Sequence, residues 1–263
     1  MRCKHCNTRL ADHDVWCVNC GRQTEVPSKQ LSAIASMKET WHSLSPLRAQ
    51  SIPAAAASII FGVVPLTLAG IVFTQVQFSF HSSNTINLLL GILLKIIVFS
   101  VFAPFLLVAF AHIGKREDYQ ISLKDYSLAM KQYPKYLLLG IVTGFYYAFI
   151  YLICFGMPSF GSDPILRLVW LVLVNYWMAI ILPVPALMEI KQIGVFRAIR
   201  LSYRHFHDLR WNLYLMALLI GILASIATAL LLVGLLYIVP FFWFAVRDYT
   251  RKLIDFELLE YHR

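Results

Sequence analysis

Four cysteines stand in the first 20 residues of the chain as two C-x2-C pairs, with ten residues between the pairs. Each pair can direct two thiolates at one point, and two pairs complete a tetrahedron around a borderline-soft cation such as Zn²⁺. Gly21 follows the last cysteine and suits a tight turn in which backbone N–H groups point at sulfur. We therefore predict a structural zinc ribbon over residues 1–25. Its predicted ligands are Cys3, Cys6, Cys17 and Cys20.

Two other uses of this cysteine pattern are a disulfide pair and a redox dithiol. A disulfide fits poorly because this end of the chain is expected to lie in the reducing cytosol. A redox dithiol of the thioredoxin type would come with a βαβ pattern, which does not accompany it. A segment of about 20 residues cannot bury a core, so a bound metal would have to supply its folding free energy.

The cysteine segment resembles the short zinc ribbons that open many bacterial membrane proteins. The shared features are an aromatic residue before the third cysteine, here Trp16, and a glycine after the fourth, here Gly21. Asn7 stands where that family usually has a second glycine, and asparagine tolerates the left-handed backbone conformation. Such ribbons carry no single function, so the resemblance implies a metal-bound module and nothing more specific.

The rest of the chain has the composition of a membrane protein, with 59% hydrophobic and 14% charged residues. Asn212–Ala245 is a run of 34 residues without a charged side chain, long for one membrane span and short for two. Four earlier apolar segments are each long enough for one span. They cover residues of about 52–74, 88–111, 136–155 and 165–188.

The basic residues predict the orientation, because Lys and Arg collect on the cytoplasmic side of membrane proteins. Of the 23 Lys and Arg residues, 21 lie in four polar segments, whereas the loops 75–87 and 156–164 contain none. The four segments are residues 1–51, 112–135, 189–211 and 246–263. All four basic segments lie on the cytoplasmic side of the membrane if the apolar run Asn212–Ala245 crosses it twice, with a turn near Ala224–Thr228. We predict an all-α polytopic protein with six transmembrane helices and both termini in the cytoplasm, in a bacterial inner membrane. The alternative has five spans, a strongly tilted last helix and the tail outside.

The polar segments before the third span and after the fourth span predict two amphipathic helices in the membrane interface. An apolar stripe and its adjacent basic residues recur between them at an offset of 73 residues, which favours a parallel internal repeat. The predicted headgroup contacts are Lys124, Lys131, Arg197, Arg200 and Arg204. The full division predicted is ribbon 1–25, linker with an amphipathic helix 26–51, transmembrane domain 52–250 and charged tail 251–263.

Residues from about 52 to 257 resemble a six-span bacterial family that includes the YciC-type proteins and the membrane domains fused to glycerophosphodiester phosphodiesterases. The resemblance is carried by PALMEIKQIGVFRAIRLSYRHF after the fourth span and by VRDYTRKLIDFE near the end of the chain. It implies the six-span fold. No phosphodiesterase domain is present, so that activity is not implied for this chain.

Three polar residues in or near the spans are candidate functional residues. Lys95 is predicted to lie in the second span not far from the midplane, where a lysine is costly and is therefore often functional; its alternative is snorkelling to the interface. Asn175, in the fourth span, could share a polar cavity with Lys95 or merely bridge two helices. Glu189, just past two prolines, is expected to form a structural salt bridge with the basic surface helices rather than to act in catalysis.

No catalytic motif is visible, so we predict a non-enzymatic membrane scaffold or accessory protein. The ribbon would dock another membrane or cytoplasmic protein, and the basic helices would contact anionic headgroups of the bilayer. The alternative is a transport or lipid-handling protein with a cavity near Lys95 and Asn175. Nucleic-acid binding is disfavoured because acidic residues offset the basic ones in the ribbon and no aromatic stacking platform is evident.

Overall fold

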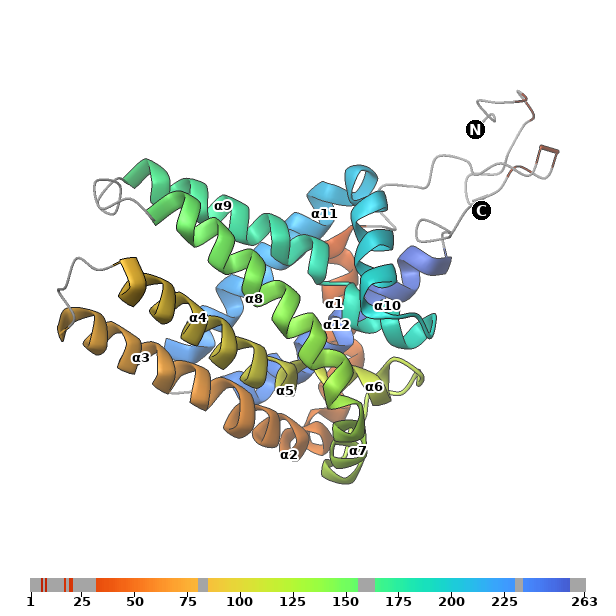
Figure 1. The fold of residues 1–263 in the computed structure, drawn as a ribbon. Helices are drawn as coiled ribbons and strands as arrows, with labels where there is room; N and C mark the ends of the chain where they lie inside the picture. The colour runs from red at the N-terminus through yellow and green to blue at the C-terminus, as the bar shows by residue number, and fades with distance from the viewer. Residues whose placement is uncertain are drawn as a thin grey trace.

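The computed structural model of the chain describes residues 6, 8, 17, 19, 20, 32–79, 85–155, 164–229 and 234–255. Within these residues all regular structure is helical. The long helices α3, α4, α8 and α9 run roughly alongside one another, and the connections from α3 to α4 and from α8 to α9 lie at the same end (Figure 1). The short helices α6, α7 and α10 gather at the opposite end, which we call the polar end.

Five segments of the described chain are long and apolar enough to cross a membrane. This number and length of apolar helices indicate a multi-pass membrane protein, as the composition predicted. The segments are Ala49–Val72, Gly91–Ile113, Leu123–Cys154, Pro164–Ile190 and Trp211–Thr228.

The first two segments are interrupted helices, and a proline lies at the first interruption of each. The first consists of α2 (Arg48–Ser58), a π-helical turn (Ile59–Val63) and α3 (Val64–Ser79). Pro65 cannot donate to the carbonyl four residues earlier, and the π-helical turn lies just before it. In the second segment Pro104 separates α4 from α5. The pieces are α4 (Thr85–Phe102), α5 (Pro104–Leu107) and α6 (Phe110–Ile113).

The third and fourth segments follow the predicted order of a short surface helix, a span and a second span. Helix α7 (Leu123–Ala129) starts with a capping box between Ser122 and Asp125, and α8 (Tyr133–Phe155) follows it after a 3-10 turn. Gly140 lets α8 approach α4, since a Cβ there would lie 2.9 Å from the carbonyl oxygen of Ser100. The fourth segment is α9 (Pro164–Ile181) and α10 (Val184–Ile190), separated at Pro183.

The second amphipathic segment is not a separate surface helix, which corrects the sequence-based expectation. It is the first part of α11 (Val195–Ala229), a continuous helix of 35 residues. The turn predicted at Ala224–Thr228 is also wrong, because these residues are helical and α12 (Leu235–Asp255) begins beyond Gly234. Val195–Ala229 contains no proline and a single glycine, so nothing in it stops a helix. A Cβ on Gly234 would lie 3.0 Å from the Cα of Ala227, so the returning chain passes close to α11.

The first and last described helices pack against each other. Helix α1 (Ala33–Leu44) is capped by Ser32 and is followed by a 3-10 turn at Ser45–Leu47, and it lies in the linker where the sequence predicted an amphipathic helix. The Thr40 hydroxyl donates to Asp248 of α12 at 2.9 Å, and the rings of Trp41 and Phe241 meet edge to face. The domain boundaries predicted after residues 51 and 250 fall inside the continuous helices α2 and α12.

Candidate functional site

Three of the four predicted metal ligands lie together. The Sγ atoms of Cys6, Cys17 and Cys20 are all within 4.8 Å of one another, and those of Cys6 and Cys17 are 3.3 Å apart. Cys17 is buried, with 1% of its surface exposed. No disulfide joins these three sulfur atoms. Cys3 lies outside the described residues, so its predicted role as the fourth ligand stays a prediction.

The spacing of the three sulfur atoms fits a tetrahedral metal site. With metal–sulfur bonds of about 2.3 Å, tetrahedral thiolate ligands lie about 3.8 Å apart. Hydrogen bonds from the hydroxyl and backbone N–H of Thr8 lower the pKa of the Cys6 thiol to about 6. The Asn19 amide donates to the same Thr8 hydroxyl at 3.0 Å, which holds it in place. Cys6 is therefore mostly thiolate at neutral pH, which is the form that binds a metal ion.

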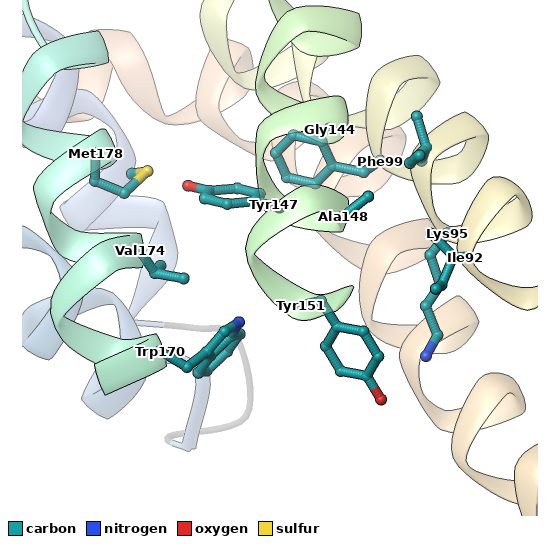
Figure 2. A pocket seen from close by; sticks show the side chains of 11 residues that line it. Ile92, Lys95, Phe99, Gly144, Tyr147, Ala148, Tyr151, Trp170, Val174 and Met178 are labelled. Carbon is teal, nitrogen blue, oxygen red and sulfur yellow. The ribbon is translucent and has the colours of Figure 1, made fainter. Parts of the chain in front are cut away.

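A second candidate site is a pocket of about 480 Å³ between α4, α8 and α9 (Figure 2). Apart from Lys95 its lining is aliphatic and aromatic, and the described residues that line it include no carboxylate. The Lys95 ammonium lies 5.2 Å from the centre of the Tyr151 ring. Lys95 and Tyr151 point toward one end of the pocket, where Trp170 also lies, whereas Tyr147 and Met178 lie toward the other end (Figure 2).

Contacts at the polar end allow the distance from that end to the Lys95 pocket to be counted along the helices. The Tyr136 hydroxyl donates to Glu189 at 2.9 Å, and a Cβ on Gly114 would lie 2.6 Å from the Cβ of Glu189. These three residues therefore lie at the same position along the length of the helices, which we call the Glu189 level. Lys95 and Trp170 each stand nineteen residues from that level, which is about 28 Å at 1.5 Å per residue. If the Glu189 level lies at one face of a hydrocarbon core, which is about 30 Å thick, this separation puts Lys95 near the opposite face. The predicted position of Lys95 near the midplane stays a prediction.

Asn175 does not line the Lys95 pocket, contrary to the predicted shared cavity. Its side-chain amide donates to the backbone carbonyl of Tyr214 at 3.4 Å. The residue therefore joins α9 to α11, which is the simpler of the two roles considered for it.

Glu189 forms the structural ion pair that the sequence predicted, although its partner is not on either basic helix. Lys135, at the start of α8, lies 2.7 Å from Glu189 Oε1, and Glu189 is only 3% exposed. Gln192, whose φ of 52° lies in the left-handed region, donates its side-chain amide to the Glu189 carbonyl. The pair thus fixes α8 to α10 at the polar end.

One buried charged residue with many contacts, Arg247, was not identified from the sequence. It is 1% exposed and donates to the carbonyls of Arg116, Glu117 and Asp118 while pairing with Asp248 at 2.8 Å. Its guanidinium also stacks on the rings of Tyr119 and Phe244. Asp248 accepts from Tyr119 at 2.8 Å, and burial together with this carboxylate raises the pKa of Tyr119. Arg247 stands in a charged segment near the end of the chain, and such a segment gives no signal that one of its side chains is buried.

Four of the predicted headgroup-contacting residues have exposed side chains. They are Lys124, Lys131, Arg197 and Arg200. The fifth, Arg204, lies in α11, but its side chain is outside the described part of the structure. Exposure is compatible with the predicted headgroup contacts, which stay a prediction.

Comparisons of the chain with protein-family models, with curated proteins and with solved structures found no match.

Proposed function

We propose that this chain is a non-enzymatic membrane scaffold whose amino-terminal cysteine module binds zinc and docks a partner protein. The observation that carries this proposal is the group of three cysteine sulfur atoms within 4.8 Å of one another. With Cys3 as fourth ligand the metal site is closed and has no position for a substrate, which is typical of structural zinc. The module is then a small folded unit suited to docking.

The attachment of α1 supports a scaffold in which the module is tethered to the helical domain. Helix α1 follows the cysteine segment in the chain and is joined to α12 by the Thr40–Asp248 hydrogen bond and the Glu39–Lys252 ion pair. Arg247 and Arg251 in turn bind backbone carbonyls of residues 114–118. A docked partner would therefore be tethered to the helical domain through α1.

For the topology we propose six spans, with α12 as the sixth, in a bacterial inner membrane with the polar end in the cytoplasm. Support comes from contacts at both ends of the α11–α12 pair. The N–H of Ile193, just before α11, donates to Met188 beside Glu189, and Arg251 of α12 donates to Gly114, which packs on Glu189. Because the helix pair α11–α12 starts and ends at the Glu189 level, it crosses the membrane an even number of times. The distribution of basic residues favours the cytoplasm for that level.

The test compares the intact protein, a Cys17→Ser/Cys20→Ser double variant and a Cys154→Ser control, each purified from native membranes in mild detergent. Cys154 is a buried cysteine of α8, away from the cluster. We expect the double variant to lose its zinc and one or more co-purifying proteins while its helical content is unchanged. The control should keep both. The same proteins retained by all three would contradict a docking role, and unfolding of the whole double variant would contradict a separate module.

A second candidate function, lipid handling, is favoured by one specific observation. The pocket around Lys95 combines an apolar lining with a single cation near the membrane interface opposite the polar end. It does not depend on the cysteine module, and the two functions are compatible in one chain.

A further inference from the structure

We propose that the Lys95 pocket binds one phospholipid of the surrounding membrane, with an acyl chain between α4, α8 and α9 and an anionic headgroup on Lys95 Nζ. This inference goes beyond the scaffold function and names the ligand class for the lipid-handling candidate. It rests on the depth, lining and charge of the pocket.

The charge of the pocket selects for an anion. Lys95 is the only charged residue among those described in the lining, and its one described partner is the neutral Tyr151 ring. A lysine held in a span without a carboxylate is costly, and an anionic ligand would offset that cost. The ammonium also lies about 28 Å from the Glu189 level, where the headgroups of the opposite leaflet begin.

The rest of the lining suits a hydrocarbon chain. Behind Lys95 the wall is formed by Phe99, Tyr147, Val174 and Met178, which offer no charge. Ala148 on α8 has a small side chain at this wall, which leaves room along the helix. The volume of about 480 Å³ falls within the roughly 300–1,000 Å³ of small-molecule pockets and is far too small for a helix of a partner protein.

The pocket can be filled from the bilayer. Lys95, Tyr151, Trp170 and Val174 are each partly exposed, so the pocket reaches the surface of the helical domain. In the membrane that surface is bathed by lipid. Tyr151 and Trp170 are residue types that favour the headgroup level, which agrees with an entrance at that depth.

The experiment measures phospholipid binding to the detergent-purified full-length protein by native mass spectrometry. The probes are phosphatidylglycerol, which is anionic, and phosphatidylcholine, which is zwitterionic, with identical acyl chains. We expect the intact protein to retain one phosphatidylglycerol more tightly than phosphatidylcholine. Lys95→Met should weaken that binding roughly fivefold, the effect of one lysine near an anionic headgroup, and Lys95→Arg should preserve it. Lys38→Met, on an exposed lysine of α1, is the matched control and should leave this site unchanged.

A second variant and a second measurement separate the pocket from general charge effects. Val174→Phe should fill the pocket and weaken the same binding while leaving Lys95 in place. In the intact protein, an anionic lipid with a photoreactive group in its acyl chain should label Tyr147 or Met178. Equal binding of both lipids, unchanged binding in Val174→Phe, or labelling spread over all exposed helices would each overturn the proposal.

Discussion

Glu189 and Lys135 form an ion pair across two helices at the polar end, with 2.7 Å between Oε1 and Nζ and almost no exposure of the carboxylate. Tyr136 adds a hydrogen bond to the same oxygen at 2.9 Å. The neighbouring residues on α8 therefore both hold α10, and the carboxylate depends on them because it is closed off from water.

Replacing Lys135 with methionine should leave a buried carboxylate without its cation. Breaking such a pair by removing one partner costs about 3–5 kcal/mol, and we expect the lower end because Lys135 is partly exposed. The free energy of unfolding, measured in detergent by denaturant titration, should fall accordingly. Lys135→Met/Glu189→Gln should recover part of the loss because the uncompensated charge is gone. Lys131→Met, on an exposed lysine, should change the stability little; an equal loss there would contradict the role of the pair.

Gly114 should tolerate no side chain at all. Its φ of −60° is ordinary helical backbone, so alanine would normally be favourable there. The added Cβ would however lie 2.6 Å from Glu189 Cβ and 2.8 Å from the Phe110 carbonyl oxygen. We expect Gly114→Ala to lower the free energy of unfolding by about 1–3 kcal/mol. Gly221→Ala, inside α11 where nothing lies within 4 Å of the new Cβ, should be neutral or stabilising in the same measurement.

Arg247 should be irreplaceable by lysine. A single ammonium cannot reach three carbonyls and a carboxylate in the way that a planar guanidinium does. Arg247→Lys should therefore loosen residues 114–118, and trypsin should cut after Lys115 or Arg116 at least about tenfold faster in detergent-solubilised protein. Arg197→Lys, on an exposed arginine, provides the control. Equal cleavage rates in both variants and the intact protein would show that Arg247 does not hold this loop.

The ionisation of Cys6 can be followed through the pH dependence of zinc binding. Hydrogen bonds from Thr8 lower the pKa of Cys6 to about 6, and only the thiolate binds the metal. Zinc retained by the purified protein at a fixed free zinc concentration should therefore fall as acid protonates the cysteines. Thr8→Val removes the hydroxyl and raises the pKa of Cys6 toward the ordinary value of 9.0, so zinc should be lost at a higher pH. The same pH midpoint in both proteins would assign the low pKa to another cause.

Local signals predicted several elements well. The helix α1 in the linker 26–51 was predicted because its apolar residues recur at helical spacing. The spans were visible because about 20 apolar residues are needed to cross a membrane. The cysteine cluster was visible because metal ligands recur at fixed short spacing.

The remaining features depend on contacts between distant segments. The continuity of α11 was missed because a uniformly apolar run carries no period that marks a turn. Asn175 was placed in the wrong cavity because spacing along α9 does not say which neighbour it faces. The burial of Arg247 follows from carbonyls about 130 residues earlier in the chain. The internal repeat and the resemblance to the YciC-type family stay predictions.

The contact between α1 and α12 has a consequence for how the protein is made. Thr40 and Asp248 are separated by 208 residues, so α1 leaves the ribosome long before its partner helix exists. At about 5–20 residues per second, this interval lasts roughly 10–40 s. During that time the apolar face of α1, including Met37 and Leu44, has no α12 to cover it. Completion of the last helix thus closes the structure, and a chain cut short before α12 would expose that face to the quality-control machinery of the cell.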